Sequence, residues 1–326
     1  MFKLFKDSTL QATFEKNGFA LLSNLLQAEE IQQLKEFYQI EIAHNAKNSI
    51  YGMYVSLDEI NTELKNNSKL LIQKIVTPKL DKFFQNYKTH LGSFLVKLPD
   101  DFSYTYPHQD WQFVRQADVD FFSATIWISL NDINTQTGNL GFIKGSHNFF
   151  DNIVGSPSPE IITSTMGHEK LLLSYLQFQD IKAGDAFIFN NKTIHAAFPN
   201  RTRDARVAVG IGITPIQADI YHYFLKPNTT NKIIELKVGS DFFENYTNLS
   251  LRETYKKKQI PKYSEIIQEL DYIPQIVSAE QMESLILQSG NVKNNLPIES
   301  LFANVQLDFM TKLKFAIKYF RNKLPI

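Results

Sequence analysis

His108 and Asp110 lie two residues apart in the segment YPHQDWQF, a spacing that could bind a metal ion. In an extended strand, side chains at positions i and i+2 project from the same face, so the imidazole and the carboxylate would hold one cation together. The alternative is a hydrogen-bonded surface pair, because a chain with 7 histidines can contain His-x-Asp by accident. The segment alone therefore leaves both interpretations open.

A third ligand is predicted at His195, in the segment AGDAFIFNNKTIHAAFPN. Gly184 and Asp185 indicate a turn, residues 186 to 189 a buried strand, and His195 follows after the apolar run has given way to polar residues. A histidine at such a strand end favours a ligand over a core residue. Two histidines and one carboxylate form the facial triad of non-haem Fe(II) oxygenases, which leaves coordination positions open for a bidentate oxoacid and O2.

Arg206 begins the next predicted strand, where the residues alternate in size. The following positions on its own face are alanine or glycine, and those on the other face are valine or isoleucine. If the small face lines a cavity, it leaves space beside a guanidinium, which suits a carboxylate held by a planar two-pronged donor. The alternative is an ion pair of Arg206 with Asp204 or Asp185.

The elements that must position these residues are short strands. Between about residues 93 and 215 the chain contains the strand-like runs SFLVKL, FFSATIWISL, LGFIKG, DAFIFN and RVAVGIGI. Turns rich in Gly, Asn, Asp and Pro separate them. Several strands at such spacing predict a sandwich or barrel rather than a βαβ sheet.

Helical patterns flank this β region. Residues 13 to 44 predict a short extended segment followed by a helix, and a second helical run spans roughly 67 to 90, with Pro78 as a kink or break. After Pro227 the pattern is mainly helical, with SEIIQEL at 264 to 270, AEQMESLILQ at 279 to 288 and a long run to Lys323. We therefore expect one domain over 1–326, with N-terminal helical support (1–92), a β core (93–215) and a mainly helical extension (216–326).

Composition narrows the function classes. A chain of 326 residues with 43% hydrophobic content can bury a large core. Lys+Arg and Asp+Glu are 34 each, so no overall field would recruit nucleic acid or an anionic membrane. The chain has no cysteine, which excludes disulfides, thiolate metal ligands and a cysteine nucleophile. Metal ligands must therefore be histidine and carboxylate.

The N-terminal segment MFKLFKDSTL is interrupted by Lys3, Lys6 and Asp7 before an apolar run long enough for a signal peptide develops. No run of about 18 apolar residues predicts a membrane span. We expect a cytoplasmic protein without a transmembrane segment.

Taken together, these motifs resemble the phytanoyl-CoA dioxygenase family. The resemblance runs from FEKNGFALLSNLLQAEEIQQL, through KLPDD and HQDW within 97 to 111 and TIWISLNDINTQTGNLGFIKGSH at 125 to 147, to the segment from His195 to Arg206. It implies a mainly β fold with flanking helices, built on a double-stranded β-helix, the cupin-like jelly roll. It also implies Fe(II) as cofactor, with 2-oxoglutarate and O2 as cosubstrates.

The family's functional residues fall on matching positions here. Its iron ligands correspond to His108, Asp110 and His195, and its oxoglutarate-binding arginine to Arg206. Trp127 matches a position that lines the oxoglutarate pocket in relatives; a buried strand aromatic is the alternative.

Three further positions affect how far the family's site residues can be assigned to this chain. Lys97 matches a lysine frequent before the His-x-Asp strand, and we expect a surface lysine at the pocket mouth. Relatives often carry Ser or Thr two residues after the distal histidine, but here the residue is Ala197. We then expect weaker binding of the cosubstrate, or a hydrogen bond from Thr125 or another hydroxyl in place of the missing one. His147, in the block KGSH, is expected to be a turn residue behind the ligands rather than a fourth ligand.

The resemblance implies hydroxylation of an unactivated C–H bond in a small molecule, with release of succinate and CO2. The substrate would be an acyl thioester, an amino-acid-like compound or a natural-product intermediate. Related halogenases replace the carboxylate ligand with a small residue, so Asp110 favours hydroxylation, with desaturation or ring closure left open. Residues 148 to 180 are expected to form a loop over the pocket and to set specificity. Lys256 to Lys258 would attract a CoA phosphate, although a solvated charged face is the usual outcome for such a run.

Other function classes remain open. The chain could be a non-catalytic β-helix protein that binds a small ligand, or a metallohydrolase that uses the same triad. A nucleic-acid oxygenase is disfavoured because the sequence has no extended basic stripe.

The C-terminal stretch LDFMTKLKFAIKYFRNKLPI has an apolar helical stripe of Leu313, Ile317, Phe320 and Leu324. We expect this stripe to pack against the core or to form a homodimer contact. Docking on a carrier protein or an anionic membrane is the alternative.

Overall fold

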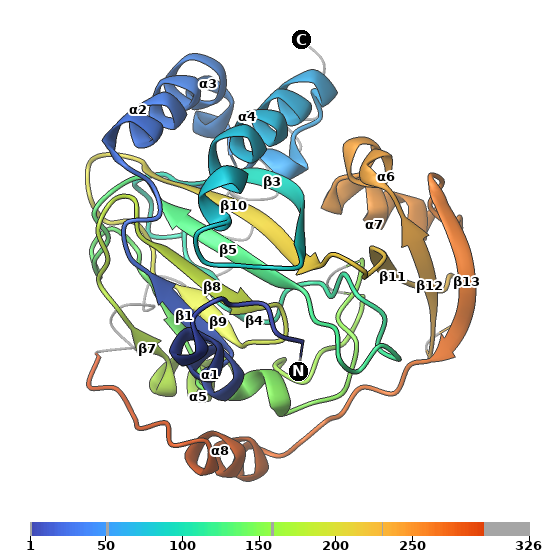
Figure 1. Ribbon diagram of the computed structural model, residues 1–326. Coiled ribbons are helices and arrows are strands. Elements are labelled where there is room, and N and C mark those ends of the chain that lie inside the picture. The colour runs from blue at the N-terminus through green and yellow to red at the C-terminus, as the bar shows by residue number, and fades with distance from the viewer. Residues whose placement is uncertain (1, 50–51, 158–159, 230, 297–326) are drawn as a thin grey trace, which may run out of the picture.

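Two antiparallel sheets lie at the centre of the molecule (Figure 1). The computed structural model describes residues 2–49, 52–157, 160–229 and 231–296. The larger sheet has the order β1-β8-β5-β10-β3-β2 and the smaller one the order β4-β9-β6-β7. The larger contains β1 (Phe19–Leu22), β2 (Met53–Val55), β3 (Tyr87–Lys97), β5 (Ala124–Ser129), β8 (Ala186–Asn190) and β10 (Arg206–Pro215). The smaller contains β4 (Thr105–His108), β6 (Leu140–Phe142), β7 (Gln177–Phe178) and β9 (His195–Ala197). This arrangement confirms the predicted jelly-roll fold.

The two faces of the larger sheet have different partners. Ile126 and Val209 belong to one core cluster with Leu34 and Ile75, which lie on the helices α2 (Ala28–Phe37) and α4 (Thr62–Leu80). On the opposite face, residues of β5, β8 and β10 pack against β6 and β9 of the smaller sheet in a second cluster. Because successive side chains of a strand alternate between faces, the predicted alternation along β10 is confirmed.

The N-terminal helices cover the outer face of the larger sheet (Figure 1). α1 (Ser8–Asn17) begins where the Asp7 carboxylate accepts hydrogen bonds from two backbone N–H groups, and it ends at Gly18, whose φ is 83°. α2 continues through a π-helical turn, η1 (Tyr38–Ile42), into α3 (Ala43–Lys47), and a 3-10 turn, η2 (Ser56–Asp58), precedes α4. The predicted helix over 67 to 90 is wrong at its end, because Pro78 cannot donate a backbone hydrogen bond and α4 stops at Leu80.

The C-terminal extension differs most from prediction. Residues 264 to 270 were expected to be helical but belong to β13 (Ser264–Asp271), which pairs with β12 (Lys232–Val238) and, through it, with β11 (Tyr221–Leu225). The pairing with β12 supplies hydrogen bonds and cross-strand ion pairs such as Lys232 with Asp271, so tertiary context overrides a weak helical pattern. The extension is therefore a mixed α/β unit rather than a mainly helical one.

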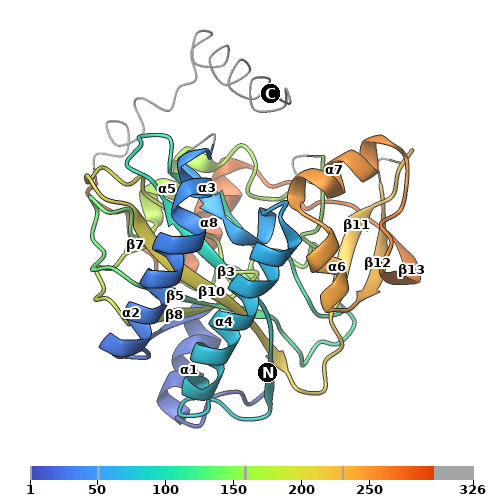
Figure 2. The same ribbon diagram turned by 90° about the horizontal axis from the view of Figure 1, so that it is seen from above.

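The strands β11–β13 lie together with α6 (Ser240–Asn245) and α7 (Asn248–Lys256) to one side of the core, whereas α8 (Ala279–Gln288) lies apart from them (Figure 2). The predicted helix over 279–288 is confirmed as α8. The buried amine of Lys65 on α4 donates to the carbonyls of Phe243, Glu244 and Tyr246, which fixes the extension to the N-terminal helices.

Several predictions about the ends of the chain and its subdivision are not tested. The helical run to Lys323 and its apolar stripe lie outside the described residues. The boundaries 1–92, 93–215 and 216–326 describe the core only roughly, because β1 and β2 also join the larger sheet. That the whole chain is one domain stays a prediction. Within the described ranges, no helix is both long and apolar enough to cross a membrane.

Candidate metal centre

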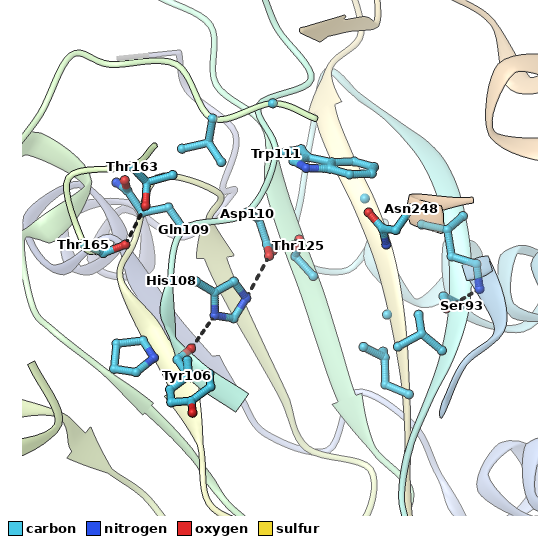
Figure 3. Close-up of a pocket in the computed structure, with 18 of the residues that line it drawn as sticks. Ser93, Tyr106, His108, Gln109, Asp110, Trp111, Thr125, Thr163, Thr165 and Asn248 are labelled. Carbon is cyan, nitrogen blue, oxygen red and sulfur yellow. Dashed lines mark hydrogen bonds and ion pairs between the residues drawn. The ribbon is translucent and has the colours of Figure 1, made fainter. Parts of the chain in front are cut away.

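His108, Asp110 and His195 come together between the two sheets' strands, as the sequence predicted. One ligand atom from each lies within 4.8 Å of the others. The backbone explains this convergence: β4 and β9 are antiparallel neighbours, and His108 stands directly opposite His195 in their register. Asp110 follows immediately after β4, and its carboxylate Oδ1 lies 3.5 Å from His108 Nε2 and 3.8 Å from His195 Nε2 (Figure 3).

Hydrogen bonds define the tautomer of both imidazoles. His108 Nδ1 lies 2.7 Å from the carbonyl of Tyr106, and His195 Nδ1 lies 3.0 Å from the carbonyl of Thr193. A carbonyl oxygen can only accept, so each Nδ1 carries the proton and donates it. Each Nε2 then keeps a lone pair directed toward Asp110, which is the form in which histidine binds a metal.

The charge state of the cluster also suits a cation. Burial lowers the pKa of His195 to about 4, helped by the neighbouring His108, so its imidazole is neutral at neutral pH. Burial alone would lower the pKa of His108, but the hydrogen bond and charge of Asp110 produce a net rise. Burial would raise the pKa of the Asp110 carboxyl, yet the two imidazoles and Thr125 hold it below its ordinary value. Asp110 therefore stays ionised and supplies the negative charge.

Two neighbours position Asp110. The hydroxyl of Thr125 donates to Asp110 Oδ2 at 3.2 Å, and the backbone N–H of Asp110 donates to the carbonyl of Asn191 at 2.8 Å. The Asn191 side chain in turn donates to the carbonyl of Trp111. Thr125, predicted as a cosubstrate contact, thus lies beside the cavity but is bonded to a predicted metal ligand. Asn191 was missed in the sequence, although a polar Asn pair directly after an apolar strand was the available signal.

Arg206 is buried and its guanidinium is only partly bonded. The residue is 3% exposed, and its Nη1 donates to the carbonyl of Gly138 at 3.1 Å, while its Nε has no partner. The guanidinium carbon lies 5.1 Å from the ring centroid of Trp127, a cation–π contact. No ion pair in the described ranges joins Arg206 to Asp204 or Asp185, the predicted alternatives. Burial lowers the pKa of Arg206 to about 9.

Lys97 corrects a prediction. It was expected to be a surface lysine, but it is 1% exposed, and its amine donates to the carbonyls of Ala197 and Phe198 at 3.1 and 2.6 Å. Lys97 pairs with Arg206 across β3 and β10. Burial and the charge of Arg206 lower the pKa of Lys97 well below its usual range. Two basic side chains therefore lie together in the interior, and no carboxylate in the described ranges is bonded to either.

The other predicted positions are also located. Ala197 is buried on β9, two residues after His195 and on the same side of the strand. His147 lies in the turn η3 (Ser146–Asn148), where its Nε2 lies 3.2 Å from the carbonyl of Glu15, and it is not part of the three-residue cluster. Lys256 to Lys258 lie at the end of α7 and do not line the cavity beside the cluster.

A cavity of about 860 Å³ opens beside His108 and Asp110. Gly210 and Gly212 of the small-residue face line it, but Arg206 and Trp127 do not. The side chains of Leu95 and His90 lean over these two glycines, which is why β10 has no Cβ there. The loop predicted over 148 to 180 supplies much of one wall, through residues between Val154 and α5 (Glu169–Tyr175). Within that segment, Glu169 lines the cavity and the neighbouring His168 does not.

The fold and the cluster define the class: a double-stranded β-helix protein that presents two histidines and one carboxylate at one end of its strands. The family model described as "Phytanoyl-CoA dioxygenase (PhyH)" matches residues 14–208. The chain belongs to the phytanoyl-CoA dioxygenase family, as its motifs predicted. No curated protein matches the chain by sequence.

Solved structures with a similar fold include three proteins of low sequence identity to this chain. The non-haem α-ketoglutarate-dependent carbocyclase SnoK from nogalamycin biosynthesis is 16% identical over 66% of this chain and 86% of its own, with a TM-score of 0.47. The epimerase SnoN in complex with Fe3+, α-ketoglutarate and nogalamycin RO is 19% identical over 65% and 84%, with a TM-score of 0.46. HygX from Streptomyces hygroscopicus with nickel, 2-oxoglutarate and hygromycin B is 13% identical over 65% and 88%, with a TM-score of 0.42. At these identities the ligands and reactions of these three proteins are not evidence for the ligands or the reaction of this chain.

Proposed function

We propose that this protein is an Fe(II)- and 2-oxoglutarate-dependent dioxygenase that hydroxylates an unactivated C–H bond of a small molecule. The observation that carries the proposal is the convergence of His108 Nε2, His195 Nε2 and the Asp110 carboxylate within 4.8 Å. Membership of the phytanoyl-CoA dioxygenase family over residues 14–208 supports the same class.

The donor set fits a divalent iron. Two imidazoles and one carboxylate make the facial arrangement that leaves open positions on non-haem Fe(II). The carbonyls of Tyr106 and Thr193 hold both rings through Nδ1, so the ligands are oriented before the metal binds. His108, Asp110 and His195 would therefore hold the ion.

The buried cations fit 2-oxoglutarate. Arg206 and Lys97 are both nearly inaccessible, and the guanidinium Nε has no partner. Two cations buried without a counter-charge are costly, because each loses its hydration. A carboxylate placed between Arg206, Lys97 and the indole of Trp127 would supply the missing charge and hydrogen bond. These residues would anchor the end of 2-oxoglutarate that lies away from the metal.

Bound iron and 2-oxoglutarate supply, with O2, an oxidising equivalent that inserts oxygen into a C–H bond and leaves succinate and CO2. The chain's own residues supply ligands, orientation and exclusion of water. Thr125 and Asn191 fix Asp110, and Arg206 with Lys97 fixes the cosubstrate carboxylate. The apolar walls of the cavity keep solvent from the substrate carbon that faces His108. Retention of Asp110 as an ionised ligand favours hydroxylation over halogenation.

The test uses protein prepared without oxygen and loaded with Fe(II) and 2-oxoglutarate. We expect the weak visible charge-transfer band of the chelate in the wild-type protein. His108→Ala should abolish the band, and Arg206→Ala should require much more 2-oxoglutarate to reach it. The matched controls are His44→Ala and Arg203→Ala, both on exposed side chains, which should leave the band unchanged.

If the loaded wild-type protein shows no band, the oxoglutarate chemistry is wrong. A non-catalytic ligand-binding protein or a metallohydrolase on the same triad would then replace it. If the band forms, succinate release coupled to a product gaining one oxygen atom supports hydroxylation. Loss of two hydrogens from the substrate, without added oxygen, would point instead to desaturation or ring closure.

A further inference from the structure

The walls of the cavity beside the metal cluster are mostly hydrocarbon. Apart from the predicted metal ligands, the charged residues among the described lining are Glu169 and Lys170, neighbours at the start of α5. Glu169 already accepts a hydrogen bond from the N–H of Gly167. Lys170 is exposed, so the interior of the cavity offers a phosphate or an α-amino acid little fixed charge of opposite sign.

The polar side chains of the same walls are largely bonded within the protein. Thr163 and Thr165 share a hydrogen bond of 3.0 Å between their hydroxyls. The hydroxyl of Ser93 accepts from the N–H of Leu57 at 3.1 Å. Asn248 donates its side-chain amide to both carboxylate oxygens of Asp58. Figure 3 shows Ser93 and Asn248 on the side of the cavity opposite His108.

A second cavity of about 400 Å³ lies behind this wall, between α4, β3 and α6. Three residues, Leu57, Leu91 and Gly92, line both cavities and so form the partition between them. The second cavity contains buried polar atoms without a partner, namely Asn66 Oδ1 and both ring nitrogens of His90. Among the described residues, the metal-side cavity contains one such atom, Gln109 Oε1, so the second cavity is the more polar of the two in unpartnered groups.

A β-bulge in β3 produces the partition. The pairing with β10 skips from Ser93 opposite Gly210 to His90 opposite Gly212, so two residues of β3 face one residue of β10. The extra residues have φ angles of 59° at Leu91 and 151° at Gly92. A positive φ is uncommon for leucine and strained residues of this kind cluster at functional sites.

Close packing of Gly92 fixes the position of the bulge. A Cβ on Gly92 would lie 3.1 Å from the carbonyl oxygen of Lys69 on α4, and the φ of 151° is one that other residues rarely adopt, so glycine suits this close approach. The bulge is thus held against α4 and directs Leu91 between the two cavities.

We propose that the metal-side cavity takes an uncharged, lipophilic substrate body, and that Leu91 ends this cavity and so limits the length of the body it accepts. The inference rests on the proposed function for the identity of the reacting site, but it concerns binding rather than turnover. Free amino acids, whose charges would have to enter the cavity, are the substrate class that it disfavours.

The test measures displacement of the neutral dye Nile red by straight-chain primary alcohols of increasing length. In the wild-type protein we expect the affinity to rise about fourfold per methylene up to a limiting length, because each buried methylene adds hydrophobic free energy. Alkyl sulfonates and alkyltrimethylammonium ions of equal length should displace the dye much more weakly. The titrations are made with and without Fe(II) and 2-oxoglutarate. A failure of alcohol binding can then be distinguished from a failure of the proposed oxygenase chemistry.

Two substitutions at Leu91 should move the limit in opposite directions. Leu91→Gly removes the side chain at a position whose positive φ suits glycine, and should extend the limiting length. Leu91→Phe should shorten it. Leu173→Ala is the control, since Leu173 lines the metal-side cavity but not the second one.

Three outcomes would overturn the inference. The first is a limit unchanged in both Leu91 variants while their circular dichroism stays native. The second is an equal shift in Leu173→Ala. The third is equally tight binding of the charged probes. If Leu91→Phe does not fold, Leu57→Ala is used in its place, because Leu57 lies on the same partition. An unchanged limiting length in Leu57→Ala would count against the proposal.

Discussion

Lys97 and Arg206 lie opposite each other across β3 and β10 and place two basic side chains in the interior of the protein. The Lys97 amine is bonded to two backbone carbonyls, and the Arg206 guanidinium to one. Neither interaction neutralises a charge. In the proposed function, the carboxylate of 2-oxoglutarate would supply the counter-charge that this pair lacks.

Lys97→Met should weaken the binding of 2-oxoglutarate by about tenfold or more, because a charge-assisted contact worth about 1.5 kcal/mol or more is lost. Isothermal titration with 2-oxoglutarate, at saturating Fe(II) without oxygen, measures the change. Lys82→Met, on an exposed lysine, is the matched control. Unchanged affinity in Lys97→Met would remove Lys97 from the cosubstrate site.

Ala197→Ser should strengthen the binding of 2-oxoglutarate. The added hydroxyl would lie two residues after His195 on the same side of β9, where relatives with Ser or Thr can bond the cosubstrate carboxylate. One new hydrogen bond to a carboxylate corresponds to a decrease in Kd of about tenfold. The same titration checks it, with Ala196→Ser on the opposite side of the strand as control. Weaker binding in Ala197→Ser would show that the cosubstrate already fills the space.

Thr125→Val should lower the affinity for Fe(II) by about tenfold or more, because the hydroxyl that orients Asp110 is removed from an otherwise similar side chain. Competition of the metal against a chelating dye gives the affinity. Thr89→Val is a control on β3 at a distance from the cluster. A change in 2-oxoglutarate binding with unchanged metal affinity would instead restore Thr125 to its predicted contact with the cosubstrate.

Acid should destabilise the fold through buried neutral histidines. Burial lowers the pKa of His222 to about 3, and its Nε2 lies 2.7 Å from the Ser156 hydroxyl. The unfolded chain takes up a proton near pH 6.5 and the folded chain does not, so the stabilisation is complete above that pH and is lost as the pH falls. For this histidine the loss is about 2 kcal/mol between pH 7 and pH 5.

Urea unfolding at both pH values measures this loss. His222→Gln, which keeps a polar group near Ser156, should show a smaller difference between the two pH values, although its stability at pH 7 is lower. His44→Gln, on an exposed histidine, should keep the wild-type difference. An equal difference in His222→Gln would assign the acid sensitivity to other groups.

The jelly roll and the metal cluster could be predicted from the sequence because both depend on local patterns. The alternation along β10 separates its two faces, and the His-x-Asp spacing places two ligands on one side of an extended segment. Local patterns do not predict that His108 pairs with His195, because the register between distant strands depends on contacts across the whole sheet.

Other features could not be predicted because they depend on long-range partners. Residues 264 to 270 have a weak helical pattern, and only the neighbouring β12 makes them a strand. Lys97 looks like a surface residue in the sequence, and its burial follows from its position opposite Arg206. The bulge at Leu91 and Gly92 also depends on the close approach of α4, which no local sequence motif predicts.

The Lys65 amine donates to three carbonyls at the end of α6 and so joins α4 to the C-terminal extension. The family match ends at residue 208, yet α4 inside the match is tied to an extension beyond it. Asn248, from the same extension, reaches the cavity wall beside Asp58. Substitutions in the extension can therefore alter the wall of the cavity while the predicted metal ligands, which all lie on or next to β4 and β9, stay in place.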